Sequence, residues 1–289
     1  MARSRWILRL SSCLALSLAV TAARAEPASE SELVWKWPRF RPAEYVLTGV
    51  VGAAAIGVFF FAGIRDEPRW TGGILFDDDV RDALRVRSRD GAATVRRLSD
   101  VAAIGVLVLT LGVDSLAVPL FRGSSDVAGQ LLLLDAEALA VNSLLTTSAF
   151  DLTARARPSY EQCQNDPTSD DLCGVGTTAS FWSGHTAQAF TAAGLSCAHH
   201  AYAKIYGSAL ADVLGCAGAI SLSAATGTLR VMGDRHYASD VLVGAVVGFG
   251  IGYGMPTLLH YTADDEPRRV GIAVVPSTSG LTLGASGRF

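Results

Sequence analysis

The sequence predicts an all-α integral membrane protein, a six-span transmembrane helical bundle followed by a short C-terminal tail that resembles a β-hairpin. Half of the 289 residues are apolar and only 18% are charged, whereas charged residues make up about a quarter of a typical soluble domain. The apolar residues gather into six stretches, each close to the roughly 20 residues that a helix needs to cross a bilayer. These stretches are 45–64, 100–121, 127–150, 185–203, 208–229 and 237–260.

The N-terminal part precedes this bundle and divides into two segments. Residues 1–25 have a basic start, an apolar run and a small-x-small cleavage site ending at Ala25, which predicts a signal peptide or an uncleaved anchor. Residues 26–44 mix Trp35 and Trp37 with basic side chains, a combination that suits the lipid headgroup region. We expect this second segment to lie on the membrane surface.

Two polar sections complete the organisation of the chain. Residues 65–98 carry mixed charges, which is typical of a solvated loop or surface helix. In the tail, two β-like runs flank a Pro-Ser-Thr-Ser-Gly turn, which predicts a hairpin. The predicted domain boundaries are therefore 1–25 for the signal or anchor, 26–44 for the interfacial segment, 45–260 for the helical membrane domain and 261–289 for the tail.

The charge distribution and the positions of the cysteines indicate which partners and which cellular compartment the protein can have. The net charge is −3 and the basic residues form no stripe with interleaved aromatics, which argues against nucleic acid as a partner. Cys163 and Cys173 share a polar loop. A disulfide between them would indicate an oxidising compartment, although two free thiols fit the spacing equally well. Acidic residues inside apolar stretches are expected to form interhelical hydrogen bonds or to sit near an interface, with a proton or ion path as the alternative, namely Asp114, Asp135, Glu137 and Asp212.

Polar side chains stand at both ends of the turn before the last apolar stretch. His236 and Asp240 are four residues apart, so on a helix they share one face and the carboxylate can accept the imidazole Nδ1–H. The other ring nitrogen would then be free to act as a nucleophile. Arg230 ends the preceding stretch and offers paired donors to phosphate oxygens. Capping for the first pair, and a membrane boundary for the arginine, are the alternative interpretations.

A second loop supplies further groups of the same kind. Arg157 follows the third stretch, and the sequence Ser-Gly-His at 183–185 opens the fourth. A glycine at a helix N-terminus lets backbone N–H groups approach an anion. His185 can donate a proton near neutral pH. Because successive spans alternate in direction, both loops reach one membrane face, and together they predict a phosphate site.

These residues resemble the three signature motifs of the type-2 phosphatidic acid phosphatase family, which shares its site with vanadium haloperoxidases and bacterial acid phosphatases. In three places the chain departs from the motifs: Phe150 stands at the first motif's lysine, Trp182 at the second motif's proline and Leu229 at the third motif's serine. The matching residues are Arg157 and Pro158 in the first motif, Ser183, Gly184 and His185 in the second, and Arg230, His236 and Asp240 in the third.

The resemblance implies a membrane enzyme that hydrolyses a phosphate ester or diphosphate of a lipid through a phosphohistidine, without a metal or another cofactor. His236 would attack phosphorus, Asp240 would orient it and His185 would protonate the leaving group. The phosphoryl oxygens would be held by Arg157, Arg230, Ser183 and the amide of Gly184, with Arg155 offering a charge in place of the missing lysine.

Two alternatives and one question of orientation stay open. The missing lysine is also typical of a catalytically impaired family member that binds a phospholipid or assists membrane assembly. The same site could instead carry phosphotransfer or vanadate-dependent haloperoxidation. Related enzymes imply a bacterial inner membrane with the site facing the periplasm, whereas simple alternation of six spans after a cleaved signal places the loop 151–184 inside the cell.

Overall fold

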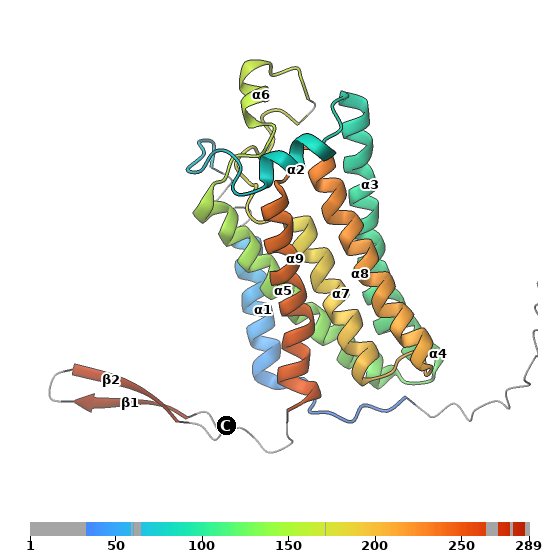
Figure 1. Cartoon of the computed structure of the whole chain (residues 1–289). Helices are drawn as coiled ribbons and strands as arrows, with labels where there is room; N and C mark the ends of the chain where they lie inside the picture. Colours follow the sequence, from blue (N-terminus) through green and yellow to red (C-terminus); the bar gives the residue numbers. More distant parts are fainter. Residues whose placement is uncertain are drawn as a thin grey trace, which may run out of the picture. The chain divides into compact units, whose positions relative to one another are not determined.

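The computed structural model describes residues 33–58, 60, 65–170, 172–263, 271–277 and 280–286, so the signal or anchor prediction for residues 1–25 lies outside the described residues. The helices are α1 Pro42–Gly57, α2 Asp77–Leu84, α3 Arg89–Leu107, α4 Val118–Phe121, α5 Ser125–Thr153, α6 Tyr160–Asn165, α7 Gly184–Tyr202, α8 Ala209–Met232 and α9 Ala238–Pro256 (Figure 1). Two π-helical stretches, η2 Val108–Ala117 and η3 Thr257–Tyr261, continue α3 and α9. Strands β1 Gly271–Ser277 and β2 Gly280–Ser286 pair antiparallel.

The helical character predicted from the apolar stretches is confirmed for the described residues, since each stretch overlaps a helix. Among the described residues, four helices are long and apolar enough to cross a membrane, and they are compatible with an integral membrane protein. α1 is apolar but has only 16 residues, and α7 is not among the four. The four candidate spans are Arg89–Phe121, Ser125–Thr153, Ala209–Met232 and Ala238–Tyr261.

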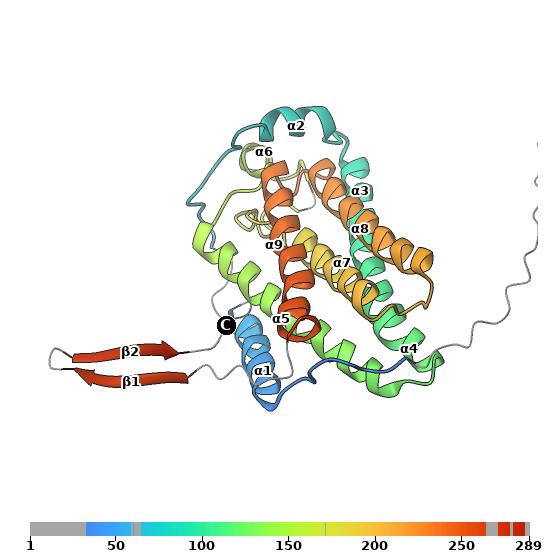
Figure 2. The same ribbon diagram turned by 60° about the horizontal axis from the view of Figure 1, so that its bottom comes forward.

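Helix α7 is surrounded by other helices. It packs against α9, α8, α5 and α3, and Figures 1 and 2 show it between these neighbours. Nearly all of its residues from Thr186 to His200 are buried. A helix enclosed by protein can carry polar side chains that lipid would not tolerate. This position is consistent with the polar side chains of α7, which is not among the four candidate spans.

Glycines bring α7 and α9 into close contact. Gly244, Gly248 and Gly252 recur every fourth residue along α9 and face α7, an arrangement that lets two helix backbones approach each other. A Cβ on Gly244 would lie 2.9 Å from the carbonyl oxygen of Ser183, and one on Gly248 would overlap the carbonyl of Ala187. The close contact therefore fixes the N-terminal half of α7 against α9.

Because this contact leaves no room for a methyl group, Gly248→Ala should destabilise the fold by about 1–3 kcal/mol, the usual cost of overpacking. The matched control is Gly250→Ala on the same helix, where a Cβ would meet nothing within 4 Å. That substitution should be neutral or stabilising by up to about 1 kcal/mol. Thermal unfolding of both variants in detergent measures the difference, and equal melting temperatures would contradict the close α7–α9 contact.

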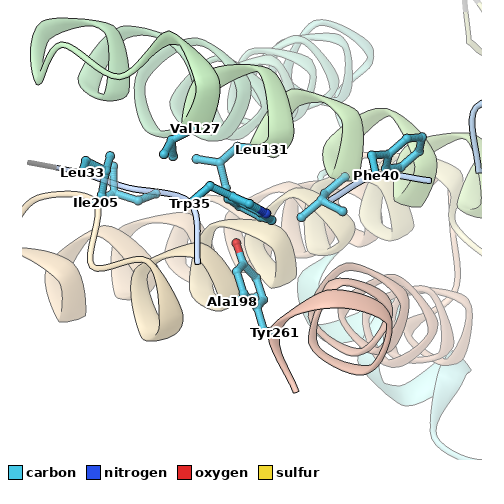
Figure 3. Close-up of a cluster of buried hydrophobic side chains, with 9 residues drawn as sticks. Leu33, Trp35, Phe40, Val127, Leu131, Ala198, Ile205 and Tyr261 are labelled. Atoms are coloured by element: carbon cyan, nitrogen blue, oxygen red, sulfur yellow. The ribbon is translucent and has the colours of Figure 1, made fainter. Parts of the chain in front are cut away.

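The segment before α1 belongs to residues 26–44, for which a place on the membrane surface stays a prediction. From residue 33 onwards the segment packs against the helical bundle (Figure 3). Leu33, Trp35 and Phe40 are buried in one apolar cluster, and the rings of Trp35 and Tyr261 lie 5.9 Å apart. The aromatic side chains find apolar partners on α5, α7 and η3.

Buried carboxylates link α7 to its neighbours, as their position in apolar stretches predicted. Asp135 of α5 contacts Nε2 of His199 at 2.9 Å, and Asp212 of α8 contacts Nδ1 of His200 at 2.8 Å. Asp114 accepts a 2.7 Å hydrogen bond from the hydroxyl of Ser196. A disulfide between Cys197 of α7 and Cys216 of α8 adds a covalent link that the sequence analysis did not predict.

Candidate functional site

A cavity of about 970 Å³ lies beside the N-terminus of α7. Its walls come from α1, α3, α5 and α7, and many of them are apolar. The predicted residues Arg157, Gly184, His185 and His236 all line it. They are joined by Asp100 of α3, which the sequence analysis did not single out. The fold thus brings two imidazoles and a guanidinium from separate loops to one cavity.

The partners of His236 define its tautomer. Its Nδ1 lies 2.8 Å from the backbone carbonyl oxygen of Ser180, which can only accept a hydrogen bond, so Nδ1 carries the proton. Its Nε2 lies 3.2 Å from Nη1 of Arg157, which can only donate. Burial and the charge of Arg157 hold the pKa of His236 well below its usual range. At neutral pH the ring is therefore neutral, with a lone pair on Nε2.

The predicted hydrogen bond between Asp240 and His236 is not formed. The carboxylate oxygen Oδ2 of Asp240 lies 4.0 Å from Nδ1, which is too long. This oxygen instead accepts hydrogen bonds from the hydroxyl of Ser180 at 2.6 Å and from the backbone N–H of Tyr237 at 2.9 Å. Asp240 therefore acts on His236 through Ser180, a residue outside the sequence motifs that no pattern had indicated.

Arg155 does not lie where the prediction of a substrate contact requires it. It is completely buried and does not line the cavity. Its guanidinium pairs with Asp240 and, at 2.8 Å, with Asp77 of α2. The same group lies 3.9 Å from the ring centroid of Trp70 and 4.2 Å from that of Tyr237. Two carboxylates neutralise its charge, so Arg155 does not replace the missing lysine.

At the position of that lysine, Phe150 presents an aromatic ring to the cavity. The ring lies 3.2 Å from the point that a Cβ on Gly184 would occupy, so it packs over the start of α7. Trp182 is held nearby by a 3.0 Å hydrogen bond from its Nε1 to the hydroxyl of Thr146. This side of the cavity is therefore aromatic where the motif would supply a cation.

The other two predicted phosphate contacts are engaged elsewhere in this structure. Arg230, at the end of α8, donates to the carboxylate of Asp100, which also lies 3.4 Å from Nε2 of His185. The hydroxyl of Ser183 caps α7, lies 2.8 Å from that of Thr186, and is fully buried. Neither Ser183 nor Arg230 lines the cavity.

Several cations nevertheless surround the polar part of the site. Burial, followed by the charges of Arg235 and Arg230, holds the pKa of Arg157 well below its usual range. Burial and the charge of Arg96 lower the pKa of Arg235 to about 10. Like charges held this close repel one another, and a bound anion would relieve the repulsion. The electrostatics therefore favour an anionic ligand.

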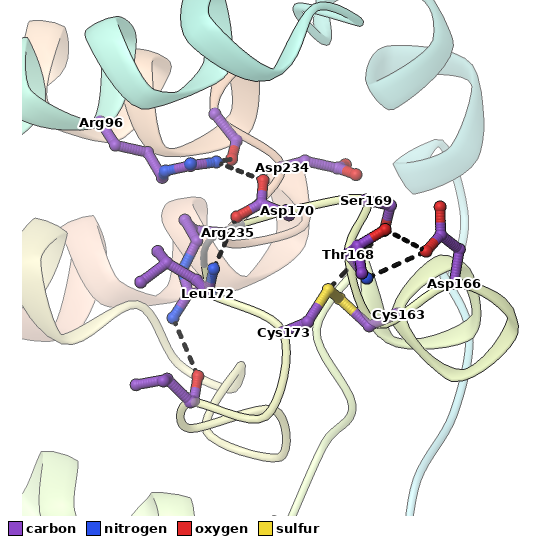
Figure 4. The surroundings of a disulfide bond; sticks show 12 residues. Arg96, Cys163, Asp166, Thr168, Ser169, Asp170, Leu172, Cys173, Asp234 and Arg235 are labelled. Atoms are coloured by element: carbon purple, nitrogen blue, oxygen red, sulfur yellow. Dashed lines mark hydrogen bonds and ion pairs between the residues drawn. A yellow bond between two sulfur atoms is a disulfide. The ribbon is translucent and has the colours of Figure 1, made fainter.

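The loop between α5 and α7, whose disulfide and neighbouring ion pair are drawn in Figure 4, anchors Arg157 from the other side. Cys163 and Cys173 form a disulfide there, so the bridge that spacing had left open is present. Arg96 pairs with Asp170 at 2.8 Å, which ties this loop to α3. The loop carbonyl of Gly176 then accepts a 2.6 Å hydrogen bond from Nε of Arg157. The disulfide loop thus orients the guanidinium toward His236.

Comparison with known protein families agrees with this geometry. The sequence model of the PAP2 superfamily matches residues 132–264, from within α5 to just beyond η3. The match supports assignment to the type-2 phosphatidic acid phosphatase superfamily, which implies phosphatase-type activity on phosphate esters. No curated protein and no solved structure matches the chain. The helices α1 to α4, including Asp100, lie outside the matched segment.

Because Arg155 is the partner of two buried carboxylates, Arg155→Ala should lower the free energy of unfolding by about 3–5 kcal/mol. The matched control is Arg39→Ala, which removes an exposed ion pair with Asp126 and should leave the free energy of unfolding nearly unchanged. Thermal unfolding in detergent compares the two variants. A stable Arg155→Ala protein with altered substrate affinity would contradict the structural role.

Proposed function

We propose that the protein is a membrane-embedded phosphatase that hydrolyses a phosphate ester or diphosphate of a lipid through a phosphohistidine. The observation that carries the proposal is the neutral imidazole of His236, whose Nε2 faces Arg157. His185 lines the same cavity. A site that only binds an anion needs cations, whereas this site also holds a nucleophile and a proton donor.

In the first step, the lone pair on Nε2 of His236 attacks phosphorus. A P–N bond forms, the bond from phosphorus to the leaving oxygen breaks, and His185 gives that oxygen a proton. In the second step, His185 takes a proton from water while the water oxygen attacks phosphorus, and the P–N bond breaks. Inorganic phosphate leaves and both imidazoles return to their starting states. Arg157 stabilises the charge on the phosphoryl oxygens in both steps.

Ser180 and Asp240 act as positioning residues in this mechanism. As Nδ1 of His236 donates to the Ser180 carbonyl, the growing positive charge on the ring is stabilised during attack. Asp240 holds Ser180 through the 2.6 Å hydrogen bond to its hydroxyl. The carboxylate is thereby coupled to the nucleophile although the two side chains are not hydrogen-bonded.

The apolar part of the cavity favours a lipid substrate. A volume of about 970 Å³ is much larger than a phosphate group needs, and apolar side chains such as Ile56, Ile104 and Leu107 extend its walls. A hydrocarbon tail could lie against them while the phosphate contacts Arg157. We further propose that α1 and α7 complete a six-span bundle with the four candidate spans, so that the cavity is reached from the bilayer.

We propose that the site faces the periplasm of a bacterial inner membrane. The disulfide between Cys163 and Cys173 supports this orientation, because its loop packs over the site and disulfides persist in oxidising compartments. Protease added to spheroplasts should cut the loop 160–176. Protection of this loop, with cleavage only after lysis, would place the site on the cytoplasmic side.

The direct test is phosphate release from phosphatidate, phosphatidylglycerol phosphate and undecaprenyl diphosphate by purified protein with chelator present. Wild type should release phosphate from at least one lipid, and His236→Ala should lose the activity because no nucleophile remains. The matched control is His260→Ala, since His260 is also buried with its Nδ1 on a backbone carbonyl, that of Pro38 at 3.0 Å. Background release by folded wild type on all three lipids would favour a phospholipid-binding or assembly protein.

A substitution at Phe150 tests whether the missing motif lysine impairs catalysis. Restoring the motif cation with Phe150→Lys should raise kcat/KM by roughly tenfold or more, because one charge-assisted contact to the transition state is regained. The double variant with His236→Ala is the control and should stay inactive. If Phe150→Lys lowers the activity of wild type, the ring itself contributes to substrate binding and the missing lysine is not a defect.

A further inference from the structure

Among the described residues that line the cavity, Asp100 is the only acidic one. It comes from α3, outside the segment matched by the PAP2 superfamily. Its Oδ1 accepts a hydrogen bond from Nη2 of Arg230 and lies 3.4 Å from Nε2 of His185. One carboxylate oxygen thus contacts a predicted phosphate clamp and the predicted proton donor together.

This position is unusual because a carboxylate offers the two groups what a phosphoryl oxygen would offer them, a negatively charged acceptor. Arg230 is buried and its Nε lacks a hydrogen-bond partner within the described residues. Without Asp100 its charge would be poorly compensated in the empty site. Asp100 therefore occupies the place of a ligand anion.

The side chain of Asp100 is exposed enough to rotate away from Arg230 and His185. Half of its side-chain surface is exposed, whereas the side chain of Asp240 is completely buried between its partners. A rotation of the exposed carboxylate would release Arg230 and His185 for a phosphate group. Because an ion pair with an exposed carboxylate is weak, this exchange is reversible.

We propose that Asp100 is an internal competitor for the phosphate of the ligand. In the empty site it holds Arg230 and His185, and a bound phosphate takes over these contacts. Its charge weakens the binding of every anion, including inorganic phosphate. The consequence for turnover, which rests on the proposed function, is that Asp100 helps to expel the phosphate product and so limits product inhibition.

The test is the affinity of the full-length protein in detergent for inorganic phosphate, measured by isothermal titration. Asp100→Asn keeps an acceptor for Arg230 but removes the charge, and should bind phosphate roughly five- to tenfold more tightly at low salt. The gain should shrink at high salt because screening weakens the charge effect. Asp100→Glu keeps the charge and should bind as weakly as wild type.

The matched control is Asp126→Asn. Asp126 is 49% exposed, against 50% for Asp100, and likewise pairs with an arginine, Arg39. Its substitution should leave the affinity for phosphate unchanged. Unchanged or weaker binding by Asp100→Asn, an equal gain in Asp100→Asn and Asp100→Glu, or no measurable binding by any variant would overturn the proposal.

This experiment involves no turnover, so its failure can be told from failure of the proposed function. If phosphate affinity follows Asp100 while wild type hydrolyses no lipid phosphate, the competitor role stands and the phosphatase proposal falls. If wild type hydrolyses a lipid phosphate but Asp100→Asn binds inorganic phosphate no more tightly than wild type, the phosphatase proposal stands and the competitor role falls. In the first case there is no turnover in which to assay product inhibition, so the binding measurement alone tests the role of Asp100.

Discussion

The site depends on a buried guanidinium that does not touch the cavity. Arg155 pairs with Asp77 and Asp240 and fixes the start of α9 beneath the loop that carries Ser180. Asp240 in turn accepts a hydrogen bond from the hydroxyl of Ser180, and the carbonyl of Ser180 accepts one from Nδ1 of His236, so the position of Arg155 determines that of the imidazole. A charge buried between two carboxylates tolerates little movement, since each lost contact leaves an uncompensated ion. This rigidity aims Nε2 of the imidazole at the cavity.

The α7–α9 contact serves the same purpose on the other side of the nucleophile. The glycines of α9 let the two backbones approach, and the N–H of Ser183 donates to the carbonyl of Asp240 at 3.1 Å. His185 and His236 thereby belong to one packed unit although 51 residues of chain separate them. Such precision suits proton transfer, which requires a donor within hydrogen-bond reach of the leaving oxygen.

Charge around the cavity is balanced in two different ways. The neutral ring of His236 and the crowded guanidiniums of Arg157 and Arg235 favour an incoming anion. Asp100 opposes them with a half-exposed carboxylate. An enzyme that releases phosphate must bind the substrate anion without retaining the product, and this opposition meets both needs.

The sequence by itself determined the helices, the chain order of the motifs and the meeting of Arg157, His185 and His236 at one end of the bundle, because apolar length and helix ends are local properties. Only the tertiary structure showed that Arg155 is buried between carboxylates, that Ser180 links Asp240 to His236, and that Asp100 lines the cavity. These depend on contacts between residues far apart in the chain, where two arginines spaced by a single residue can face opposite environments. Spacing along the chain cannot show which of them is buried between carboxylates and which faces the cavity.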